Sequence, residues 1–119
     1  MNLPEIWLTK AENDLKSAKV LKNHSQDLYD TSIFHAQQSA EKAFKAYFAF
    51  KEIQIPRTHD LELLNNKCIE FDDDFINLEQ CAINLIPYST EFRYPGLSMK
   101  PDINDLEDAI TVPLQMEID

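Results

Sequence analysis

The sequence predicts an all-α protein, an up-and-down bundle of about five helices. The first observation is the spacing of apolar side chains in the middle of the chain, which recur every three or four residues, as on one buried face of a helix: Ile33, Ala36, Ala40, Ala43, Tyr47 and Phe50. The second is composition, because a single glycine, Gly96, stands among abundant Ala, Leu, Glu and Lys, which favour helix. At 119 residues, we expect one domain that spans 1–119.

The first two helices are expected at about 4–22 and 28–53. Pro4 suits the first turn of a helix, where its missing N–H is not needed. The first helix has a short apolar stripe, with Trp7 and Leu21 at its edge: Leu8, Ala11, Leu15 and Ala18. Asp14 projects beside this stripe, so we expect it to pair with a cation from another helix or to take part in a site. Pro56 limits the second helix.

Three shorter helices are expected in the rest of the chain. Thr58 or Asp60 is expected to cap the helix at about 61–70, whose inward residues are Leu61, Leu64 and Cys68. Residues 72–74 form an acidic turn without the alternating ligands of a calcium loop. A fourth helix should run from 75 or 76 to about 92, with Leu78, Ala82 and Leu85 inward and a kink at Pro87, and a fifth from 102 to about 112.

The second helix has two distinct faces. Phe34, Phe44 and Phe48 widen its apolar stripe, so that we expect cover on two sides, from the bundle and from a second copy in a homodimer. The remaining stripe is polar and follows helical spacing: His35, Gln38, Lys42 and Lys45. Such a stripe is either a solvated face or a surface that holds a ligand.

Charge is distributed unevenly along the chain. The formal net charge is −10; residues 1–58 carry eight Lys or Arg against seven Asp or Glu, and residues 59–119 carry three against fourteen. An acidic chain is a poor general binder of nucleic acid, so any contact with RNA needs a local patch, drawn from Lys42, Lys45, Lys51 and Arg57. The acidic half suits a basic partner.

Several classes of protein are excluded by absent patterns. The sequence has no signal-peptide core and no apolar run of about 20 residues, which predicts a cytoplasmic protein without membrane contact. It has no glycine-rich phosphate loop, no nucleophile elbow and no pair of histidines at metal-binding spacing. Cys68 and Cys81 do not form a metal-ligand pair and are expected to be reduced. We therefore expect neither a cofactor nor a metal.

Four segments, in this order and spacing, resemble the HEPN domain family over nearly the whole chain. They are Trp7 with Asp14-Leu15, the run from Phe34 to Ala46, Thr58-His59-Asp60-Leu61, and Tyr88 with Arg93-Tyr94-Pro95. The resemblance implies an up-and-down bundle that is usually dimeric and binds nucleotide or RNA. Small prokaryotic members are often encoded beside a minimal nucleotidyltransferase and act with it as a toxin–antitoxin pair.

Catalytic HEPN proteins are metal-independent endoribonucleases with an Arg followed, after four to six residues, by a His. With Arg93 in the first position, the second falls on Ser98, Met99 or Lys100. No imidazole is there to transfer a proton, so no catalytic residue is assigned. The leading expectation is a non-catalytic nucleotide- or RNA-binding subunit that acts with a nucleotidyltransferase. The alternatives are a toxin endoribonuclease with a degenerate motif and a purely structural partner-binding module.

The polar residues admit a binding account and a structural account. In the first, Lys42, Lys45 and Arg93 contact phosphate, His35 and Gln38 hydrogen-bond a base or ribose, and Tyr94 stacks on a base. In the second, which we favour for Arg93 and Asp14, these two residues pair inside the bundle, His59 braces its loop, and Tyr94 closes the end of the fourth helix.

Overall fold

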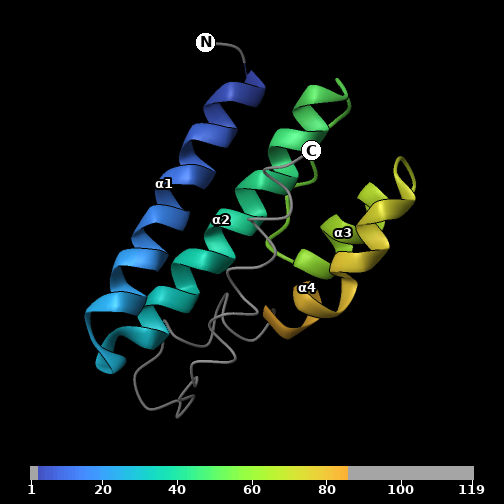
Figure 1. Cartoon of the computed structure of the whole chain (residues 1–119). Helices are drawn as coiled ribbons and strands as arrows, with labels where there is room; N and C mark the ends of the chain where they lie inside the picture. The colour runs from blue at the N-terminus through green and yellow to red at the C-terminus, as the bar shows by residue number, and fades with distance from the viewer. Residues whose placement is uncertain (1–2, 86–119) are drawn as a thin grey trace.

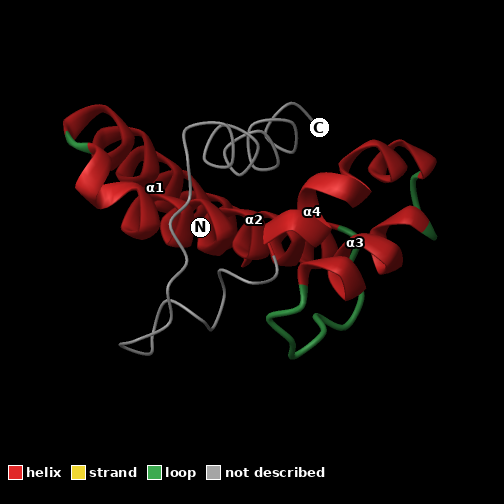
Figure 2. Cartoon of the chain, turned by 90° about the horizontal axis from the view of Figure 1, so that it is seen from below, coloured by secondary structure: helices red, strands yellow, loops and turns green. Residues whose placement is uncertain are grey.

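The structure, a computed structural model, describes residues 3–85, and the regular secondary structure of that range is helical (Figure 1). Its elements are α1 (Leu3–His24), the 3₁₀ turn η1 (Gln26–Leu28), α2 (Tyr29–Phe50), α3 (Leu61–Ile69), the 3₁₀ segment η2 (Asp73–Leu78) and α4 (Glu79–Leu85). Figure 2 shows helices and loops only, without a strand in the described residues. The predicted all-α class is confirmed, whereas the helix expected at 102–112 lies outside the described residues.

α1 and α2 pack along each other as an antiparallel pair (Figure 1). Their contact is made largely of buried small residues, which let the two backbones approach closely: Ala11, Ala18, Ser32, Ala36, Ser39 and Ala40. The Ser32 hydroxyl donates to the Ala18 carbonyl oxygen at 2.6 Å, and the Ser39 hydroxyl donates to that of Ala11, also at 2.6 Å. Two hydrogen bonds about two turns apart on each helix fix the register of the pair.

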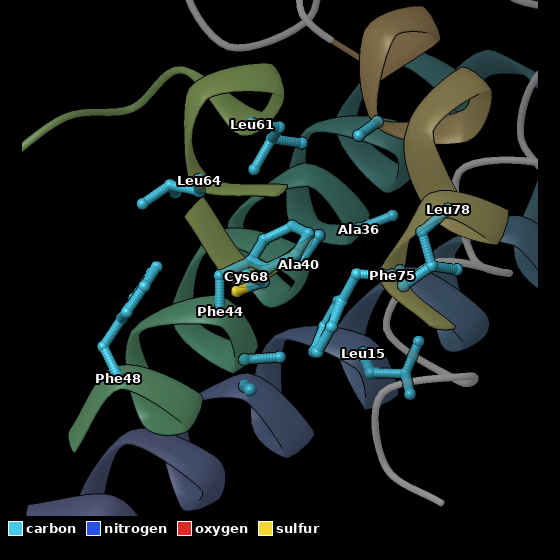
Figure 3. Packing of buried hydrophobic residues seen from close by; sticks show 14 of the residues in the cluster. Leu15, Ala36, Ala40, Phe44, Phe48, Leu61, Leu64, Cys68, Phe75 and Leu78 are labelled. Atoms are coloured by element: carbon cyan, nitrogen blue, oxygen red, sulfur yellow. The ribbon is translucent and has the colours of Figure 1, made fainter. Parts of the chain in front are cut away.

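α3, η2 and α4 cover another side of α2 and complete the core (Figures 1 and 3). Phe44 and Phe48 point from α2 into a cluster with Phe75 of η2 (Figure 3). The inward residues predicted for the third helix are confirmed, since Leu61, Leu64 and Cys68 are all fully buried. Burial raises the pKa of the Cys68 thiol to about 12, because the apolar surroundings disfavour the thiolate.

The predicted end of the second helix is wrong by three residues. α2 ends at Phe50, because Glu52 takes a left-handed conformation with φ 57°. The Glu52 and Ile53 amides then donate to the Ala49 and Phe48 carbonyls, at 3.1 Å each, which is a Schellman ending. Glycine usually occupies the left-handed position at the end of a helix, so a glutamate there does not reveal the end of α2 in the sequence.

The start of the fourth helix is also corrected. Residues 75–78, expected as α-helix, belong to the 3₁₀ segment η2, which Asp72 caps by accepting the Asp74 amide at 2.9 Å. By contrast, α3 begins as predicted, because the Asp60 carboxylate accepts the amides of Glu62 and Leu63. Pro87 and the expected continuation to residue 92 lie outside the described residues.

Two side chains predicted to face the core are exposed at one end of the α1–α2 pair. Leu8 is 38% exposed and Phe50 is 69% exposed. They border a shallow apolar groove of about 270 Å³ that also includes Tyr47 and Phe75. The periodicity placed them correctly on the apolar stripes of their helices, but no element within residues 3–85 buries that end. None of the helices in the same range is long and apolar enough to span a bilayer.

Leu64 and Leu63 offer a matched test of the core, because they are neighbours on α3 with opposite environments. Leu64 is fully buried, whereas Leu63 is 42% exposed. We expect Leu64→Ala to lower the free energy of unfolding by about 2–5 kcal/mol, and Leu63→Ala by about 0.5 kcal/mol or less. Urea unfolding followed by circular dichroism measures both. Equal losses would contradict the placement of α3.

Candidate binding site at the α1–α2 seam

The polar stripe of α2 lies at the edge of its contact with α1, where it meets Asp14. The Lys42 ammonium donates to one Asp14 carboxylate oxygen, and His35 Nδ1 lies 3.3 Å from the other. All three side chains are partly buried, Lys42 being 25% and His35 31% exposed. Asp14 therefore pairs with a cation from another helix. The pairing of Asp14 with Arg93, which we favoured, cannot be placed, because Arg93 and Tyr94 lie outside the described residues.

A second carboxylate, Glu41, organises the next part of the stripe. Its side chain is only 5% exposed, and one oxygen accepts from the Lys45 ammonium at 3.3 Å. Its other oxygen lies 2.8 Å from Nδ1 of His59, which comes from the loop before α3. The structure thus joins Lys45 to His59, two residues that the sequence placed in separate elements, through a residue that was not singled out.

Glu41 could not be singled out from the sequence, because this residue falls among apolar neighbours on the helix. It lies between Phe34 and Phe48 around the circumference of α2, outside the polar stripe. The sequence contains one indication of its role. Glu41 is a carboxylate within an apolar arc, and it lies four residues before Lys45, a spacing that favours an ion pair. Its partner in the loop, His59, could be found only from the tertiary structure.

A cavity of about 520 Å³ opens beside the Glu41 cluster, between α1, α2 and the loop 54–59. Trp7 of α1 and Lys45 of α2 form its helical walls, and Arg57 and His59 belong to its loop wall. The Lys45 ammonium lies 5.6 Å from the centroid of the Trp7 ring, within cation–π range. Lys51, expected in the same basic patch, instead lies over the rings of Tyr47 and Phe50.

Gln38, the remaining residue of the stripe, donates to the side-chain oxygen of Gln37 at 2.7 Å. Gln37 is fully buried, and its own amide nitrogen has no hydrogen-bond partner among the described residues. The Gln38 side chain itself is partly exposed. The stripe therefore presents an amide next to the two ion-pair clusters.

The α1–α2 seam is the row of polar side chains along the edge of the contact between these two helices. The pairings of Asp14 and Glu41 decide its chemistry. Each of its two carboxylates contacts one lysine and Nδ1 of one histidine, which orients each imidazole and directs Nε2 away from the carboxylate. Each ammonium retains donors beyond the one used by its carboxylate. No cluster of three or more His, Cys, Asp or Glu residues in the described part of the chain could hold a metal ion. The seam suits hydrogen bonding to an anionic or polar ligand.

Comparison with known proteins identifies the family. The model of the HEPN domain matches residues 4–113, which is nearly the whole chain. This chain belongs to the HEPN family. The fold is shared with the crystal structure of ST0689, an archaeal HEPN homologue, at a TM-score of 0.72 and 27% sequence identity, over 98% of this chain and 93% of that chain. No curated protein matches the sequence. The HEPN family is associated with nucleotide- and RNA-related functions, and the resemblance seen in the motifs is confirmed.

Removal of the Glu41 charge tests whether this carboxylate holds the seam of the HEPN domain together. Glu41→Gln keeps the shape of the side chain but leaves Lys45, which is 12% exposed, without its counter-charge. We expect a loss of about 1–3 kcal/mol in the free energy of unfolding. Glu12→Gln on the exposed side of α1 is the control, with an expected change within about 0.5 kcal/mol. Chemical denaturation measures both, and an equally small effect in the two variants would refute the structural role.

Proposed function

We propose that this HEPN protein is a non-catalytic RNA- or nucleotide-binding subunit that works with a minimal nucleotidyltransferase. The observation that carries the proposal is the position of Lys42 and Lys45. They lie about one turn apart along the α1–α2 seam, where Asp14 of α1 holds Lys42 and Glu41 of α2 holds Lys45. Two ammonium groups fixed at this spacing suit contact with phosphate oxygens of one ligand.

The neighbouring side chains supply the polar contacts that a nucleotide needs. His35 and Gln38 are partly exposed on the same stripe, so that their free polar atoms can hydrogen-bond a base or a ribose. Arg93 and Tyr94 are assigned to the same site on the family resemblance alone, for phosphate contact and stacking.

The balance of charge at the seam argues for few phosphate contacts. Asp14 and Glu41 offset Lys42 and Lys45, so the seam lacks the uncompensated basic surface of a general nucleic-acid binder. With two phosphates contacted, the logarithm of the association constant for single-stranded RNA should fall with a slope of about −1.4 against the logarithm of salt concentration. A shallow salt dependence is therefore part of the proposal.

Neutral replacement of both lysines is the direct test. Lys42→Gln with Lys45→Gln removes the two cations without bringing a like charge against Asp14 or Glu41. We expect the double variant to lose the rise in melting temperature that short RNA or ATP produces in the parent protein. Lys51→Gln is the matched control, because Lys51 is exposed and lies over Tyr47 and Phe50 instead of the seam.

The proposal is wrong if neither RNA nor ATP at millimolar concentration shifts the melting temperature of the parent protein. RNA recovered intact after incubation in EDTA separates binding from cleavage. Products that appear with the parent protein and persist in Arg93→Ala would indicate a contaminating nuclease, whereas products lost in that variant would favour the endoribonuclease alternative.

The partner is proposed from the family and from the acidity of the second half of the chain. We expect the protein, as a homodimer, to co-purify with a nucleotidyltransferase encoded by the adjacent gene, through contacts that include the exposed carboxylates of Asp73 and Asp74. Asp73→Asn with Asp74→Asn should weaken the complex, and Glu12→Gln should leave it unchanged. A pull-down at increasing salt measures the complex, and light scattering measures the oligomeric state. An unchanged complex in the Asn variant would exclude this surface.

A further inference from the structure

The cavity beside Glu41 has an aromatic wall whose ring face meets a cation instead of the apolar core. Trp7 lines the cavity, and the Lys45 ammonium lies over its ring, 5.6 Å from the centroid. A cation in this place is an exchangeable neighbour, because a planar ring that stacks on this face takes the place of the ammonium over the indole, and Glu41, 3.3 Å away, keeps a carboxylate oxygen for the displaced ammonium. The Lys45 ammonium is then next to the substituents of the stacked ring.

The opposite wall is a loop that the fold holds in place at its end. His59 Nδ1 lies 2.8 Å from Glu41, and Asp60, the next residue, caps α3. The wall runs from Gln54 to His59 and includes Arg57, whose guanidinium is exposed and forms no ion pair with any residue of 3–85. The cavity thus combines one aromatic face with two cations, the exposed Arg57 of the loop and the largely buried Lys45 of α2.

The indole N–H of Trp7 is a buried donor without a hydrogen-bond partner among residues 3–85. It lies in the plane of the ring, so the ring face and the two cations, and not this N–H, are what a stacked base would contact. The volume of about 520 Å³ falls within the range of small-molecule clefts, about 300–1,000 Å³.

We infer that this cavity is a stacking pocket for one unpaired base of single-stranded RNA. The base lies on Trp7, and the phosphates on either side of it contact Lys45 and Arg57. The inference rests on the proposed function, which it deepens by naming the RNA class and the position of a base. Base pairs of a duplex stay stacked on one another and cannot reach a ring inside a cavity, so the pocket selects against double-stranded RNA.

Trp7 provides the readout, because it is the one tryptophan of the chain. The full protein is titrated with a short single-stranded RNA that carries a fluorescent label, with the same RNA in a duplex, and with an oligonucleotide of abasic residues. Anisotropy of the label reports binding at any site, and quenching of the Trp7 emission reports occupation of the cavity. We expect quenching by the single strand alone, with a dissociation constant equal to that from anisotropy.

Substitutions in the pocket test the same inference without fluorescence of the protein. Trp7→Leu should weaken binding of the single strand about tenfold or more and leave binding of the abasic oligonucleotide unchanged. Trp7→Phe, which keeps an aromatic ring, should retain most of the affinity and shows that the fold tolerates change at this position. Arg57→Gln should weaken both ligands, and Lys51→Gln neither.

The outcomes separate this inference from the proposal on which it rests. Binding of the single strand by anisotropy without quenching of Trp7, or equal affinity for the single strand and the abasic oligonucleotide, overturns the stacking pocket and leaves the RNA-binding function standing. Absence of any binding by anisotropy overturns both. Quenching by the duplex equal to that by the single strand overturns the selectivity for unpaired bases.

Discussion

The close approach of α1 and α2 is the constraint on which the rest of the described structure depends. Alanines and serines line the contact, and the Ser32 and Ser39 hydroxyls bind carbonyl oxygens of α1 at two levels. A carbonyl oxygen in a helix has a second lone pair free for such a bond, so each carbonyl can accept the serine hydroxyl and keep its helical hydrogen bond. Because both levels must be satisfied together, neither sliding nor rotation of one helix against the other is tolerated. The positions of the polar side chains at the edge of the contact are therefore fixed as well.

The site is a consequence of how narrow this contact is. Small residues at its centre bring the longer side chains at its edge within reach of each other, so that Asp14 of α1 meets Lys42 and His35 of α2. Glu41 does the same between α2 and the loop before α3, through Lys45 and His59. The two carboxylates hold the cations in fixed positions along the edge of the contact, and Lys45 and His59 also line the cavity beside Trp7. Such preorganisation favours a specific ligand over general attraction to polyanions.

Much of the fold could be predicted from local patterns. The helical period located α1, α2 and α3 to within a few residues, and the cap at Asp60 and the inward face of α3 agree with the structure. The predictions were wrong at positions where local patterns do not decide the structure. At some an unusual backbone conformation decided it, and at others a tertiary contact. Glu52 ends α2 without a glycine, and Leu8 and Phe50 lie on apolar stripes that no described element covers.

The sequence by itself determined the helical class, the order of the helices and the family, because these depend on periodicity and on motifs that are read along the chain. It also indicated the polar stripe of α2 as a candidate binding surface. Only the tertiary structure decided which side chains meet. The buried position of Glu41, the pairing of Asp14 with Lys42 and the cavity beside Trp7 each join residues from different elements. Contacts of that kind are set by the register and distance of helices, for which a single sequence carries no direct measure.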